Sequence, residues 1–214
     1  MRIIYPALLG LLAGISVSGA AFADAEKPVP RMENDLLTSR EILSTTRAMG
    51  LANNMVASSS GTSAVWHNPA GITSAVMYAV DAGYYYDNDA NGHGFEANVV
   101  DMKSNQYVGA AIGFTYQYSE PSEPSQHALQ SRIGLAVPLA DNMISLGVSF
   151  VYSYMKYDGE EFMSQFTMDA GLVIRPLKWL SLGVAAQNLI VGKFDKWMPR
   201  MISAGIAAGR SNSD

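Results

Sequence analysis

An all-β fold, more specifically a transmembrane antiparallel β-barrel of the outer-membrane type, is predicted by three observations on this chain of 214 residues. From about residue 75 onward, apolar side chains alternate with small or neutral ones at the period of a β-strand. The neutral face carries very few charges, whereas a soluble β-domain would cover its outer face with them. The N-terminus has the features of an export signal. A soluble all-β domain with its apolar face inward is the alternative.

The alternation is clearest in two segments. One apolar row consists of Val108, Ala110, Ile112, Phe114, Tyr116 and Tyr118, set against Gly109, Ala111, Gly113, Thr115 and Gln117. A second consists of Ile144, Leu146, Val148, Phe150, Tyr152 and Tyr154, set against Ser145, Gly147, Ser149 and Ser153, with Val151 as the exception. In a barrel embedded in lipid, the apolar row faces the acyl chains and the small or polar row faces the interior.

Residues 1–23 are expected to be a cleaved signal peptide. Arg2 supplies the positive charge, residues 3–17 form the apolar run, and Ala21-Phe22-Ala23 has the small-x-small form of a cleavage site. A retained membrane anchor is the alternative, but the run is short for a span. No later apolar run reaches about 18 residues, so export leaves the periplasm, the outer membrane or the medium of a two-membraned bacterium. The barrel pattern selects the outer membrane among these.

Residues 24–74 alternate poorly and are expected to form a leader and a segment that lies in or under the barrel. For residues 75–214 we expect about eight strands, near 75–86, 93–101, 107–118, 128–138, 143–156, 163–175, 179–189 and 200–208. Short and long connections tend to alternate after the third strand, as periplasmic turns and outer loops do. Six tyrosines near strand ends indicate an aromatic belt at the headgroup level or, for any single one, cross-strand packing: Tyr84, Tyr86, Tyr116, Tyr118, Tyr152 and Tyr154.

Composition argues against several classes of function. The chain has no cysteine, so it has neither disulfides nor thiolate metal sites. A net charge of -5 gives no reason to expect nucleic acid. His67, His93 and His127 lack metal-ligand spacing, and no nucleophile-elbow, phosphate-loop or dinucleotide motif occurs. We therefore expect no catalytic residues, metal or cofactor, although an outer-membrane hydrolase whose triad is assembled by folding stays open.

Two stretches resemble the FadL-like outer-membrane proteins, that is, long-chain fatty-acid transporters and relatives that include the PorV/PorQ-type proteins. The first joins Arg47–Leu51 to Ala64–Ile72, which contains an aromatic residue shortly before Asn-Pro-Ala-Gly. Ala52-Asn53-Asn54 stands where relatives often have a Gly-Gly pair. The second stretch, residues 166–189, is similar to a glycine-rich hairpin common in the same group. Together these stretches span most of residues 45–190.

The resemblance implies that the N-terminal segment is a hatch, a plug within the barrel lumen whose movement opens a path for an apolar ligand. Its gating or ligand-binding residues would be Trp66, Asn68, Pro69, Ala70 and Gly71. Pro69 restricts Asn68 to an extended conformation, the Asn68 amide can bond nearby backbone, and Gly71 permits tight approach. These residues can equally form a rigid turn before the first strand, and Trp66 can anchor the plug by packing instead of lining a path.

A few charges are expected to face the barrel interior: Asp81, Glu96, Arg132, Asp169 and Arg175. Salt bridges in the lumen would stiffen the barrel, because lone buried charges are costly. The alternative role is a polar contact for a ligand carboxylate, which would need Arg132 or Arg175.

The resulting functional hypothesis is passive uptake of small hydrophobic compounds such as long-chain fatty acids, with membrane lipid and a hydrophobic ligand as partners. A PorV-type scaffold or shuttle for surface proteins, without transport, is the alternative, and a purely mechanical anchor is the third. About eight strands are fewer than the family barrel usually has, and the polar end Arg210–Asp214 lacks a terminal aromatic residue. We interpret the chain as part of a larger barrel, with a complete small barrel as the alternative. The sequence does not predict an oligomeric state.

Overall fold

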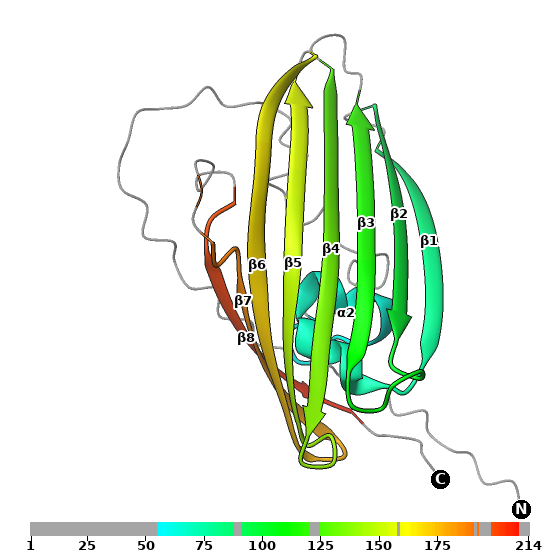
Figure 1. The fold of residues 1–214 in the computed structure, drawn as a ribbon, viewed down its shortest axis with the longest axis vertical. Helices are drawn as coiled ribbons and strands as arrows, with labels where there is room; N and C mark the ends of the chain where they lie inside the picture. Colours follow the sequence, from blue (N-terminus) through cyan, green and yellow to red (C-terminus); the bar gives the residue numbers. More distant parts are fainter. Residues whose placement is uncertain are drawn as a thin grey trace, which may run out of the picture.

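The computed structural model describes residues 55–87, 91–119, 125–157, 159–190, 192 and 198–209. These residues form one antiparallel sheet of eight strands, in which each strand pairs with the next along the chain (Figure 1). The strands are β1 (Tyr78–Asp87), β2 (Gly92–Asp101), β3 (Gly109–Ser119), β4 (Gln126–Leu139), β5 (Ile144–Tyr157), β6 (Glu160–Leu177), β7 (Leu180–Gln187) and β8 (Met201–Ala208). The predicted all-β class is confirmed.

All eight predicted strands are present, with ends that differ by three residues or fewer. The most informative difference lies between β5 and β6, where the predicted strands end at residue 156 and resume at residue 163. The strands instead continue to Tyr157 and begin again at Glu160, and Gly159 takes a positive φ of 79° in the tight connection. The expected alternation of short and long connections is therefore wrong at this place.

The two faces of the sheet differ as the alternation predicts. In β5, Leu146, Val148 and Phe150 are exposed, while Ser149 and the exceptional Val151 are buried on the other face. The same division runs across the neighbouring strands. Exposed aliphatic and aromatic side chains on the outward face include Val80, Ile112, Phe114, Ile133, Leu135, Phe166, Val184, Ile202 and Ile206. The apolar row thus faces away from the rest of the protein.

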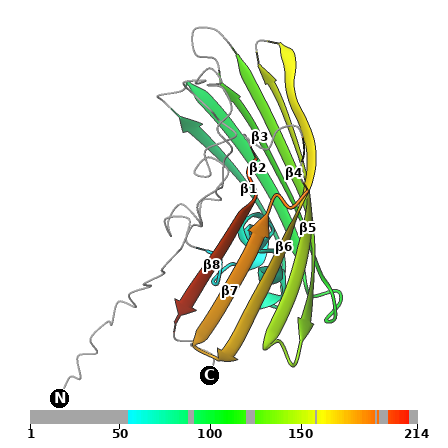
Figure 2. The same cartoon turned by 90° about the vertical axis from the view of Figure 1, so that its left-hand side faces the viewer.

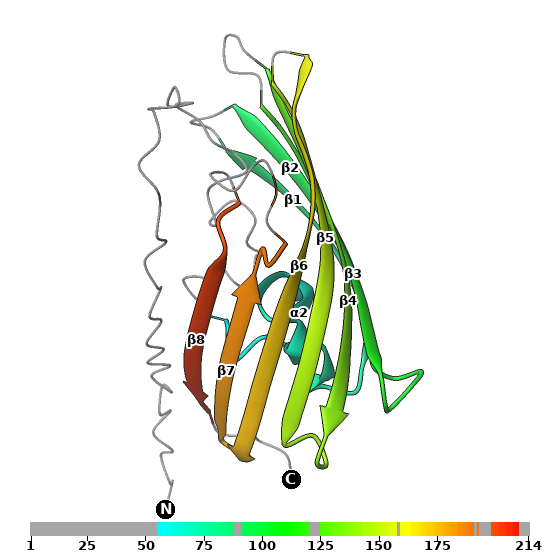
Figure 3. The same ribbon diagram turned by 60° about the vertical axis from the view of Figure 1, so that its left-hand side comes forward.

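The inward face holds residues 55–74, which we call the inner segment. It contains the short helices η1 (Gly61–Ser63), α2 (Ala64–His67) and η2 (Pro69–Ser74). These lie in the lower half of the concave side of the sheet, towards the end that carries the β4–β5 and β6–β7 turns (Figures 1 and 3). The segment contributes buried side chains to a core shared with the wall: Ala64, Val65, Trp66 and Ile72 pack with Val100, Ala111 and Ala136.

The sheet curves around the inner segment without closing (Figure 2). In the described part of the chain, β1 and β8 each have one strand neighbour and do not pair with each other, so these strands form an open, curved wall instead of a closed barrel. The described ranges contain no helix that is long and apolar enough to cross a membrane. The expected signal peptide at 1–23, the leader and first motif up to residue 54, and the polar end at 210–214 lie outside the described residues.

Candidate functional site: the inner segment and its attachment to the wall

The turn at Asn68-Pro69 redirects the inner segment. Helix α2 ends at His67, and Asn68 is extended, with φ -155° and ψ 104°, because the Pro69 ring disfavours a helical conformation at the preceding residue. Pro69 then occupies the first turn of η2, where a missing N–H costs nothing. The Asn68 Oδ1 atom accepts a hydrogen bond from the Ala70 N–H at 3.1 Å and caps η2. The expected restriction of Asn68 by Pro69 is present.

The Asn68 side chain also fastens the inner segment to the wall. It is fully buried, and its Nδ2 atom lies 2.7 Å from the Val56 carbonyl oxygen. The same nitrogen lies 3.3 Å from the carbonyl oxygens of Leu172 in β6 and Val184 in β7. One amide therefore joins the turn to the start of the inner segment and reaches two strands, with acceptors for both of its N–H groups.

Backbone packs directly against the wall beside this asparagine. A Cβ atom on Gly147 would lie 2.3 Å from the Ala70 nitrogen and from the Pro69 carbonyl carbon. A Cβ atom on Gly171, directly across from Gly147 in the β5–β6 register, would lie 2.0 Å from the Asn68 Oδ1 atom. Gly147 and Gly171 have no side chain where the turn docks. The turn therefore lies closer to β5 and β6 than it could if either position carried a Cβ atom.

Trp66 is packed, with 5% of its surface exposed. Its indole N–H donates to the Asn98 Oδ1 atom in β2 at 2.6 Å, and its ring lies over Gly113, where a Cβ atom would meet it at 2.8 Å. The Arg132 guanidinium carbon lies 5.2 Å from the ring centre, within the range of a cation–π contact. These contacts pack Trp66 against the wall and join it to β2 by a hydrogen bond.

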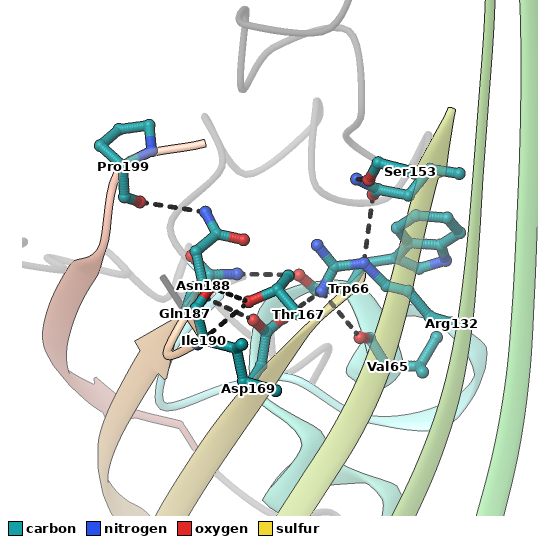
Figure 4. Close-up of polar contacts among 11 residues, drawn as sticks. Val65, Trp66, Arg132, Ser153, Thr167, Asp169, Gln187, Asn188, Ile190 and Pro199 are labelled. Atoms are coloured by element: carbon teal, nitrogen blue, oxygen red, sulfur yellow. Dashed lines mark hydrogen bonds and ion pairs between the residues drawn. The ribbon is translucent and has the colours of Figure 1, made fainter. Parts of the chain in front are cut away.

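Arg132 and Asp169 form a buried ion pair behind Trp66 (Figure 4). Their side chains are 8% and 1% exposed. Arg132 also donates to Gln130 at 3.2 Å and to the Val65 carbonyl oxygen at 3.4 Å. Asp169 accepts the Asn188 backbone N–H at 2.8 Å through its other oxygen. Because both ions have further hydrogen bonds, the pair meets the conditions under which a buried salt bridge is tolerated.

The ion pair belongs to a series of polar contacts that crosses the concave face from the first strand to the last. In order, the contacts join Asp81 in β1, Asn98 in β2, Trp66 in the inner segment, Arg132 in β4, Asp169 in β6, Asn188 after β7 and Pro199 before β8. The described inner segment is thereby held across the width of the wall, and Figure 4 shows its central and β8-side part.

Two further charges of the predicted set lie outside this series. Glu96 is half-buried on the inward face of β2, beside Gly83. Arg175 lies near the end of β6 and contacts Ser74 at the end of the inner segment and Asn142 in the β4–β5 turn. Asp81, expected to face inward, does accept hydrogen bonds from Asn98 and Thr62, but it is exposed because β1 is an edge strand.

Sequence reasoning missed several polar residues that complete the attachment. Asn98 and Gln187 bind the indole N–H and the carbonyl oxygen of Trp66, and Thr73 bonds the Ser145 hydroxyl at 2.7 Å. A signal was present for Gln187, which is a long polar side chain after Ser181, Gly183 and Ala185 in the inward row of β7.

The site so described consists of hydrogen bonds, one ion pair and close backbone packing. Within the described ranges, no group of three or more His, Asp or Glu side chains is placed to hold a metal ion. Comparison of the chain with protein-family models, with curated proteins and with solved structures returned no match.

Proposed function

We propose that this chain forms an outer-membrane β-barrel wall with an internal hatch, of the FadL-like type, which lets small hydrophobic compounds such as long-chain fatty acids pass. One observation carries the proposal: the apolar row of every central strand faces outward, while the inner segment covers the lower half of the inward face. A protein surface with this many exposed aliphatic side chains on one continuous face is suited to lipid and not to water.

The height of the apolar face supports the membrane assignment. Along β5 the outward row runs from Ile144 to Tyr154 without a charged residue. Ten residue steps cover about 33 Å along a strand, which projects to about 25 Å at a tilt of about 40°. That is the height of the apolar band on outer-membrane barrels.

Aromatic side chains form rows along the strand register at the upper end of this face. Tyr84, Tyr116 and Tyr154 fall in one row through the strand register, with Phe95 and Leu129 between them. Tyr86 and Tyr118 occupy the next row, together with His93 and His127. Amphipathic rings gathered towards one end of the strands are typical of the interface between hydrocarbon and headgroups.

In the proposed mechanism, an apolar ligand enters from the outer side, the region of Asn68, Pro69 and Ala70 moves, and the ligand leaves down its concentration gradient. No cofactor is needed for such passive movement. In lipid, the free edges of β1 and β8 also require partners, because unpaired backbone groups are costly there. The proposal therefore includes strand pairing at both edges.

A PorV-type scaffold without transport is the second candidate, and the attachment of the inner segment favours it. A plug held by a buried ion pair, a buried amide and close backbone packing is expected to stay in place. The two functions therefore differ in whether the inner segment moves.

A disulfide between the inner segment and the wall tests that difference, since the chain has no cysteine of its own. Thr73→Cys with Ser145→Cys places thiols where hydroxyls now lie 2.7 Å apart. Proteoliposomes with this double variant would be assayed for uptake of a labelled long-chain fatty acid, oxidised and then reduced. Gln130→Cys with Ser153→Cys is the matched control, because these directly opposed residues link two wall strands only.

Transport through a moving hatch predicts that oxidation abolishes uptake in the first variant, that reduction restores it, and that the control keeps uptake in both states. Uptake that is equal in all states rejects hatch movement. No uptake by the unmodified protein with both sheet edges paired rejects transport and leaves the scaffold.

A further inference from the structure

The end of the inner segment, Arg175 and the β6–β7 turn line an open cavity that the proposed mechanism does not use. Its volume is about 570 Å³, within the usual range of small-molecule sites. Apolar lining comes from Met143, Leu177, Trp179 and Leu180, and polar lining from serines of the inner segment and from Arg175. We propose that this cavity binds the anionic head of a single-chain amphiphile, a carboxylate in the first instance, with Arg175 as the residue that contacts it.

The surroundings of the two inward arginines decide which one can bind an anion. Arg132 is paired with Asp169 and covered by Trp66, so its charge is already neutralised. Within the described ranges Arg175 forms no ion pair, and its hydrogen-bond acceptors are neutral: Asn142, Ser145 and Ser74. These bonds are donated by its two terminal nitrogens, and among the described residues Nε has no acceptor. A half-buried guanidinium with neutral partners favours an anionic ligand more than a neutral one.

Two other charged side chains line the cavity. Lys178 lines the cavity from the β6–β7 turn and adds a second positive charge. Asp141 lines it from the β4–β5 turn, is exposed, and lies beyond ion-pair distance of both cations. The net charge of the lining is therefore positive. Trp179 and the leucines supply the apolar surface that the alkyl chain of an amphiphile would cover.

This inference rests on the proposed function, since it names the chemical class of ligand that leaves beneath the hatch. A fatty acid and an alkyl phosphate share the required chemistry, a small anion on an apolar chain. The cavity lies at the end of the wall nearer the short turns, next to Ser74, where the inner segment ends. A ligand that has passed the inner segment would meet Arg175 there before release.

The test is a binding measurement on the full chain in uncharged detergent. A bromine-labelled decanoate quenches tryptophan fluorescence when it lies beside Trp179, and Trp179→Phe identifies the part of the signal that comes from this cavity. Unlabelled decanoate, decan-1-ol and decyl phosphate then displace the probe. Arg175→Gln removes the charge and Arg175→Lys retains it. Arg200→Gln is the matched control, because Arg200 is an exposed cation before β8 that does not line the cavity.

We expect decanoate to bind at least about tenfold more tightly than decan-1-ol. A charge-assisted hydrogen bond is more favourable than a neutral one by a free energy that corresponds to roughly a tenfold change in affinity. Arg175→Gln should bring the ratio close to one, Arg175→Lys should keep part of it, and Arg200→Gln should leave it unchanged. Decyl phosphate that equals decanoate assigns the site to small anions in general, and weaker decyl phosphate assigns it to carboxylates.

Equal affinity for decanoate and decan-1-ol in the unmodified chain overturns the inference, whether or not any variant folds. A ratio that survives Arg175→Gln overturns the role of Arg175. If no probe binds in the cavity while proteoliposomes still take up fatty acid, the inference fails and the proposed function stands. If both are absent, both fail.

Discussion

Adding a single methyl group to the wall at Gly147 should displace the inner segment. A Cβ atom there would lie 2.3 Å from the backbone of Pro69 and Ala70, where ordinary contact begins at about 3.4 Å. The atoms that the added Cβ would overlap belong to the backbone, which Asn68 and Pro69 hold in place. Removing the overlap therefore requires the whole turn to shift by roughly 1 Å. Gly205 in β8 is the matched control, because its Cβ would meet Val56 at 3.4 Å, an ordinary contact.

The expected magnitude follows from two opposing effects. Overpacking against a fixed neighbour costs about 1–3 kcal/mol, and the rigid backbone at this site places Gly147→Ala near the upper end. Alanine restricts the unfolded chain more than glycine does, which returns about 0.4–1 kcal/mol at compatible positions. We therefore expect Gly147→Ala to lower the free energy of unfolding by about 2 kcal/mol. Gly205→Ala should leave it unchanged or raise it by up to about 1 kcal/mol.

Denaturant unfolding in detergent, followed by tryptophan fluorescence, measures the global effect. Hydrogen exchange by mass spectrometry measures the local one at the amides of Asn68, Ala70 and Gly71, all of which are hydrogen-bonded in the inner segment. Faster exchange there in Gly147→Ala, but not in Gly205→Ala, is the expected pattern. Equal exchange and equal stability in both variants would refute the claim that the wall admits the turn only because it lacks a side chain.

Two further predictions concern the polar attachments. Asp169→Asn leaves Arg132 buried without its counter-ion and should destabilise the protein by about 3–5 kcal/mol in the same unfolding assay. Adding Arg132→Gln should recover part of the lost stability. A double variant that is no more stable than Asp169→Asn alone would contradict the pairing. Asn68→Asp replaces a donor that faces three carbonyl oxygens by an acceptor. It should therefore increase hydrogen exchange in the inner segment more than Asn68→Ala does. Equal exchange in the aspartate and alanine variants would show that these contacts contribute little.

The strands and the orientation of their faces could be predicted from the sequence because period two assigns each residue to one face. The chemistry of each face then indicates its environment. The one misplaced connection has a physical reason. The polar stretch 157–161 lies beyond the apolar end of the wall, and strands continue to pair there although neither face is apolar. Hydrophobic periodicity detects burial or lipid contact and is insensitive to hydrogen bonding between strands.

The local geometry at Asn68 and Pro69 was predictable for a different reason, since a proline restricts its neighbour whatever surrounds it. The ion-pair partner of Arg132, by contrast, could not be predicted from the sequence. In the strand register Arg132 aligns with Val151 in β5, and Val151 aligns with Thr167 in β6. Asp169 is the next inward-facing residue of β6 after Thr167, and β6 is not a direct neighbour of β4, the strand that carries Arg132. The pair forms across β5, and only the register and the curvature of the wall bring its two charges together.

The inward row does carry a signal for the position of the inner segment. In the lower half of the wall, where the segment lies, inward residues are mostly glycine, alanine and serine, as at Gly134 and Gly147. Towards the upper end they become longer: Gln117, Gln130 and Gln165. A water-filled lumen tolerates small and long polar side chains at any height. A change from small to long along each of several strands instead requires an object that fills one half of the interior. The small residues make this face a poor surface for contact with water. The same residues leave the space in which the inner segment packs against the wall.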